Sequence, residues 1–67
     1  MFHIEINQMI GGQMHRRVGC LELHTSEEEV AKSLFYDLER RFGEDYSLAL
    51  TYTRPVSTVT VCRSQNY

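Results

Sequence analysis

The 67-residue sequence predicts an α+β fold of the order ββαββ, a four-stranded, mainly antiparallel sheet with one amphipathic helix packed on one face. Three observations lead to this prediction. Apolar and polar residues alternate in the first and last thirds of the chain, which is the pattern of half-buried strands. The middle third repeats apolar residues at helical spacing. Glycine or proline stands near the points where these patterns change.

The first strand pair precedes the helix. Apolar residues alternate with polar ones from Phe2 to Ile6, so this segment predicts a strand with one buried face. Gly11-Gly12-Gln13 follows as a hairpin turn, and the second strand runs roughly over residues 14–24. The apolar residues of this second strand change face near Gly19, which predicts a β-bulge there.

The helix is predicted over residues 26–42. Ser26 followed three residues later by Glu29 is a capping-box pattern, and Gly43 is the expected terminator in a left-handed conformation. Acidic residues in the first turn and arginines in the last turn complement the helix dipole. The apolar stripe consists of Val30, Ala31, Leu34, Phe35, Leu38 and Phe42.

The second strand pair is predicted over residues 46–53 and 58–63, joined by a turn at Pro55, which cannot donate to a sheet ladder. A right-handed crossover favours the spatial order 2-1-3-4, with 1-2-3-4 as the alternative. The chain is then a single small domain of residues 1–67, in which residues 64–67 form a frayed polar tail. We expect a core in which Leu34, Leu38 and Phe42 meet Ile4, Ile6, Leu48, Leu50, Val59 and Val61.

The composition argues against several classes of protein. The net charge is −2, so the chain as a whole does not attract nucleic-acid phosphates. No apolar run is long enough for a membrane span, and two cysteines do not make a disulfide framework. We therefore expect a cytoplasmic protein with reduced thiols and without membrane contact.

Residues with metal-binding or nucleophilic chemistry are present without the spacing that such sites need. His15, Cys20 and His24 are zinc-ligand types, but they lack the close pairs of a finger or ribbon. Cys62 and His24 supply a thiol and a base, and nothing in the sequence brings them together. The sequence predicts no metal, no cofactor and no catalytic site.

Two surfaces favour a protein partner. Tyr36 lies opposite the apolar stripe between Lys32 and Arg40, with Glu29 nearby, and exposed tyrosine beside arginine is typical of interface hot spots. The helix-free sheet face presents Thr51, Thr58 and Thr60. A solvated tyrosine and an ordinary solvated strand face are the alternative interpretations. The leading hypothesis is a small interaction protein that acts stoichiometrically on a larger partner as an inhibitor, adaptor or regulatory subunit, of the size and charge found among phage- and plasmid-encoded inhibitors.

The alternative function is a small dimeric nucleic-acid-binding protein. It would use His15, Arg16 and Arg17 beside the first hairpin together with Arg54 and Arg63 near the second. Independently of function, residues 58–63 are rich in β-formers and uncharged until their end, which is a poorly protected sheet edge. We therefore expect a homodimer through this strand or the threonine face beside it.

Overall fold

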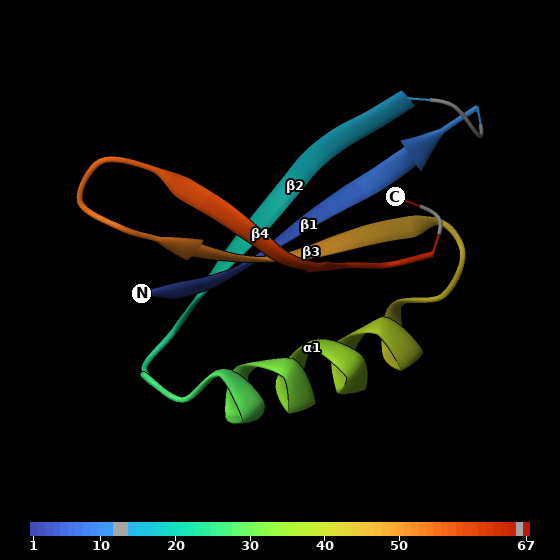
Figure 1. Cartoon of the computed structure of the whole chain (residues 1–67). Coiled ribbons are helices and arrows are strands. Elements are labelled where there is room, and N and C mark those ends of the chain that lie inside the picture. Colours follow the sequence, from blue (N-terminus) through green and yellow to red (C-terminus); the bar gives the residue numbers. More distant parts are fainter. Residues whose placement is uncertain (12–13, 66) are drawn as a thin grey trace.

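The computed structural model describes residues 1–11, 14–65 and 67, and consists of one antiparallel sheet with one helix against it (Figure 1). The strands lie in the spatial order β2-β1-β3-β4, so β2 and β4 are the two edges. The predicted ββαββ arrangement and strand order are confirmed. The elements are β1 (Phe2–Ile10), β2 (Met14–Leu23), α1 (Glu28–Phe42), β3 (Tyr46–Thr53) and β4 (Thr58–Arg63).

Each edge strand carries a β-bulge. Ile6 of β1 pairs with Gly19 while the next residue of β1 pairs with Arg17, so Val18 is the extra residue, next to the glycine where the sequence predicts a bulge. On the other edge, the pairing skips Val61 in the same way. A bulge bends and twists its strand, so both outer strands depart from a flat ladder near their middle or end.

Two glycines have positive φ at the points where the chain turns. Gly11 has φ 62° directly after β1, and Gly43 has φ 75° directly after α1. Gly43 therefore ends the helix with positive φ, but its ψ of −168° lies outside the left-handed helical region that we expected. The rest of the predicted hairpin turn, Gly12 and Gln13, lies outside the described residues.

The helix begins later than the sequence predicts. Its first helical residue is Glu28 and its N-cap is Glu27; within the described chain no side chain caps this end. The Thr25 hydroxyl instead accepts a hydrogen bond from the backbone N–H of Glu27 at 3.1 Å. This local side-chain turn competes with helix formation and leaves Ser26 outside the helix, so the expected capping box of Ser26 and Glu29 does not form.

The core forms between the middle of α1 and the two central strands. Phe35 and Ala31 are fully buried against Ile4 of β1 and Leu48 and Leu50 of β3. Leu38 and Phe42 continue this stripe along the helix and are half-buried against the same cluster.

Two residues that we expected in the core lie outside it. Leu34 is 44% exposed because the helix is turned so that Ala31 and Phe35, rather than Leu34, face the sheet. Val59 is also exposed, since it lies on the edge strand beside the hairpin that projects from the sheet (Figure 1).

The end of the chain is attached to the sheet at Ser64, where we expected a frayed tail. The Ser64 backbone N–H donates to the Leu48 carbonyl at 2.8 Å, and the Leu48 N–H donates to the Ser64 hydroxyl at 2.9 Å. These two bonds continue the β3–β4 ladder one step beyond β4 and bury the serine. Tyr67 remains exposed and contacts residues of the sheet described below.

Candidate functional site

The outward face of α1 holds the residues predicted for a protein partner. Tyr36 is 51% exposed, and Glu29 and Arg40 on the same face are exposed as well. Lys32 lies closer to the sheet and is half-buried. The tyrosine is the exposed large apolar group on this face, and charged side chains surround it.

Ion pairs along the helix hold these charged side chains in place. Lys32 Nζ lies 3.1 Å from a Glu28 carboxylate oxygen, and this hydrogen bond together with the negative charge raises the pKa of Lys32. Asp37 accepts hydrogen bonds of 3.0 Å from both Arg40 and Arg41. The bond from Arg40 is the largest cause of the lowered pKa of Asp37. Such exposed pairs order the side chains without adding much stability.

The predicted threonine face is only partly available. Thr58 and Thr60 are exposed on β4, opposite Thr53 and Thr51 of β3. Thr51 is only 5% exposed, although it lies on the helix-free side of the sheet. It occupies a central strand between His3 of β1 and Thr60 of β4, and its buried side chain offers little contact area to a partner.

Three of the five predicted nucleic-acid contacts come together on the helix-free face. His15 Nδ1 lies 2.8 Å from the Ser47 hydroxyl, and its ring centroid lies 5.3 Å from that of Tyr67. The Arg63 guanidinium lies over the same tyrosine ring, 5.4 Å from its centroid, in a cation–π contact. Arg17 shares this face and pairs with Glu5, which neutralises its charge.

The other two predicted contacts lie elsewhere. Arg16 pairs in register with Gln8, so its side chain is on the helix side of the sheet. Arg54 belongs to the turn between β3 and β4, at the opposite end of the sheet from His15, and its N–H closes the turn on the Ser57 carbonyl at 2.7 Å. The predicted basic surface is therefore divided over two faces and two ends.

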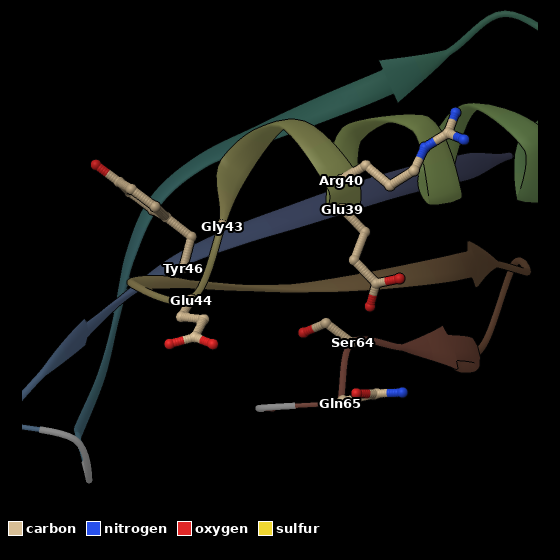
Figure 2. Close-up of a pocket in the computed structure, with 7 residues that line it drawn as sticks. All are labelled: Glu39, Arg40, Gly43, Glu44, Tyr46, Ser64 and Gln65. Carbon is tan, nitrogen blue, oxygen red and sulfur yellow. The ribbon is translucent and has the colours of Figure 1, made fainter.

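A shallow hollow of about 650 Å³ lies between the end of α1 and the end of β4. Figure 2 shows the Glu39 carboxylate directed toward Ser64, whereas the Arg40 side chain points away from it. Its lining residues are Glu39, Arg40, Gly43, Glu44, Tyr46, Ser64 and Gln65. A second hollow, of about 420 Å³, lies beside Leu23 and Tyr52. Both are open to solvent, so neither isolates a reacting group from water.

An exposed apolar surface lies where the sequence pattern predicts no site. We call it the apolar shelf and define it by Leu21 of β2 and Val30 and Leu34 of α1. Leu21 pairs with the buried Ile4, so it faces the helix side, yet it is 43% exposed. Val30 and Leu34 are exposed too. More than half of the exposed large apolar side chains of the described residues belong to this flank of α1 or to the β1–β2 hairpin: Ile10, Met14, Val18, Leu21, Val30 and Leu34.

The position of α1 explains the shelf. The helix packs mainly on β3, and Lys32 is close enough to Cys62 of β4 for an electrostatic interaction, so the flank of the helix that carries Lys32 is the one toward β4. Val30 and Leu34 lie on the opposite flank at 100° per residue and point toward β2. The helix therefore leaves the helix side of β2 open. The sequence indicates this surface through the apolar stripe of α1, which is too wide to be covered completely by the contact between the helix and the sheet.

Among the described residues, no group of three or more His, Cys, Asp or Glu side chains is arranged to hold a metal ion. Both cysteines are free thiols, Cys20 exposed and Cys62 half-buried. In the part of the chain that the structure describes, no helix has the length and apolar character needed to cross a membrane. Comparison with known proteins finds no matching family, no matching curated protein and no matching solved structure.

Proposed function

We propose that this protein is a non-catalytic interaction module, which acts stoichiometrically on a larger protein as an inhibitor, adaptor or regulatory subunit in the cytoplasm. The observation that carries the proposal is the apolar shelf. Contiguous exposed apolar surface on a small domain favours burial against a partner. The charged residues that flank it are held in ion pairs on the same helix, which reduces the entropy that binding must overcome.

The shelf is a stronger candidate for the main contact than the outward face around Tyr36. On that face a single aromatic side chain stands among charged groups, whereas the shelf combines apolar side chains from two elements. Interfaces are apolar at their centre and polar at their rim. We therefore assign Glu29, Lys32, Tyr36 and Arg40 to the rim of the interface or to a second, weaker contact.

Capture from extracts of the native host tests this proposal when it is done with matched variants. We expect the tagged parent to retain one protein at a stoichiometric ratio, Leu34→Glu to lose it, and Val56→Glu, in the turn between β3 and β4, to keep it. Both substitutions place a new charge on an exposed side chain, so the folded domain should tolerate both. Equal retention by all three proteins would contradict an interaction through the shelf.

We further propose that the protein forms a homodimer through the β4 edge. The bulge at Val61 restricts the regular part of this edge to Thr58, Val59 and Thr60, all exposed. An unpaired strand edge with β-branched side chains favours pairing with a second strand. The contact would be short, so the dimer is expected to dissociate on dilution.

Nucleic-acid binding is the second candidate function, and the cluster of His15, Arg63 and Tyr67 favours it. An aromatic ring beside cationic groups on an open sheet face is the composition of a base-stacking platform. The cluster has few positive charges, because Glu5 neutralises Arg17. A gel-shift titration with single-stranded RNA and DNA tests this function. Binding that weakens steeply with salt and is lost in Arg63→Ala would support it.

A further inference from the structure

The helix side of the sheet has room for a second helix. Strands lie about 4.8 Å apart, so four strands span about 14 Å between the outer strand axes. A helix with its side chains is about 10 Å wide. Because α1 packs mainly on β3 and its core side chains cover β1, the uncovered strip on the helix side is β2. The axis of β2 lies two strand spacings, about 10 Å, from that of β3, which is the usual distance between two packed helices.

The open strip has an apolar floor and an apolar wall. Leu21 forms the floor, in register with the core residue Ile4 and on the same side of the sheet. Val30 and Leu34 form the wall, one helical turn apart on the flank of α1 that points toward β2. They are 41% and 44% exposed, so each still has nearly half of its surface to bury. A floor and a wall at this spacing fit a helix that lies beside α1.

Two arginines lie at one end of this strip. Arg16 is on the helix side of β2, opposite Gln8, and Gln8 also pairs with Tyr46 at the start of β3. The last turn of α1 leads into the start of β3 and contains Arg41, seven residues after Leu34 and thus on the same flank. The charge of Arg41 is neutralised by its ion pair with Asp37. Arg16 forms no ion pair with another described residue, so a segment bound along the strip meets this arginine, which favours a carboxylate in the ligand there.

We propose that the apolar shelf binds one amphipathic helix of the larger protein partner, with its apolar face on Leu21, Val30 and Leu34 and acidic side chains toward Arg16. This inference rests on the proposed function and adds the chemistry of the partner segment to it. The bound helix completes a two-helix layer over the four-stranded sheet and removes the shelf from water. Such helix-in-groove recognition places anchors at positions i, i+3, i+4 and i+7 of the bound segment.

Nuclear magnetic resonance titration with designed peptides tests the inference. The probes are three helical peptides of about 18 residues: one with a leucine stripe and glutamates, one with the same stripe and lysines, and one with the glutamate composition in scrambled order. We expect the glutamate peptide to shift the signals of Leu21, Val30 and Leu34 while those of Thr58 stay in place. We expect the scrambled peptide to bind at least tenfold more weakly, because its leucines no longer share a face.

Two variants separate the apolar and the charged parts of the site. Leu34→Glu should weaken the glutamate peptide at least tenfold, since it removes an apolar anchor and adds a like charge. Arg16→Glu should reverse the preference between the glutamate and lysine peptides. Val56→Glu, in the exposed turn between β3 and β4, is the matched control and should bind the peptides as the parent does. Circular-dichroism melts confirm that each variant is folded.

The outcomes separate this inference from the proposed function. Absence of shelf shifts with every peptide at millimolar concentration overturns the helix ligand, and loss of the captured host protein in Leu34→Glu would then still support an interaction through the shelf. Shelf signals that change with protein concentration alone, together with a dimer that Leu34→Glu dissociates, would show that a second copy occupies the shelf and would also overturn the inference.

Discussion

Two neighbouring residues of α1 should respond very differently to truncation. Phe35 is fully buried, and removing a buried phenylalanine costs about 3–5 kcal/mol of unfolding free energy. A 67-residue domain has roughly 3–10 kcal/mol in total, so Phe35→Ala should be close to unfolded at room temperature. Leu34 is 44% exposed, and Leu34→Ala should cost about 1 kcal/mol because much of its side chain is already in water. Urea denaturation followed by circular dichroism measures both values.

The milder variant Phe35→Leu keeps the comparison measurable if Phe35→Ala does not fold. It leaves an apolar side chain in the core and should cost about 1–2 kcal/mol. The helix orientation would be refuted if Leu34→Ala lost as much stability as Phe35→Ala. It would also be refuted if Phe35→Leu were as stable as the parent, because Phe35 would then lie outside the core.

Other parts of the structure give further tests. Thr60→Lys should shift a β4 dimer toward monomer in light scattering by placing charge on the exposed edge, and a parent that is monomeric at high micromolar concentration would rule that dimer out. Ser64→Ala should cost about 1–3 kcal/mol in a thermal or urea melt, since the buried N–H of Leu48 loses its acceptor; an unchanged melt would mean that water replaces the hydroxyl. The lowered pKa of Asp37 contributes stability that is fully present above its ordinary value of 3.8 and is lost as the pH falls through the lower folded pKa. Asp37→Asn should therefore destabilise the protein at neutral pH and match the parent in strong acid, and a constant difference across this range would contradict the assignment.

Alternation and turn residues were enough to predict the elements and their order. The strand periods, the glycine after the helix and the bulge near Gly19 all depend on local sequence, and all are present. The predicted start of the helix at residue 26 is wrong because two local hydrogen bonds compete there: a cap by the Ser26 side chain and a turn formed by the Thr25 side chain. Thr25 forms a turn with the N–H of Glu27, and nothing in the pattern shows that this option is preferred over a cap by Ser26.

The candidate site was harder to predict because it depends on how the helix lies on the sheet. The apolar stripe of α1 is wider than its contact with the strands, so the sequence cannot show which part faces inward. For this reason the stripe predicts Leu34 in the core, whereas in the structure Leu34 forms part of the apolar shelf. Likewise, alternation places Leu21 on the helix side of β2 but does not reveal that the helix lies over β3 instead.

The two bulges have a consequence for polymerisation. Fibre growth by strand stacking draws on uninterrupted segments of about six or seven residues. The bulge at Val18 divides β2 into stretches of residues 14–17 and 19–23, and the bulge at Val61 divides β4 into residues 58–60 and 62–63. Every stretch is shorter than such a segment. The folded chain therefore exposes an apolar surface for binding, but its edge strands are too short to act as templates on which further copies add to form a fibre.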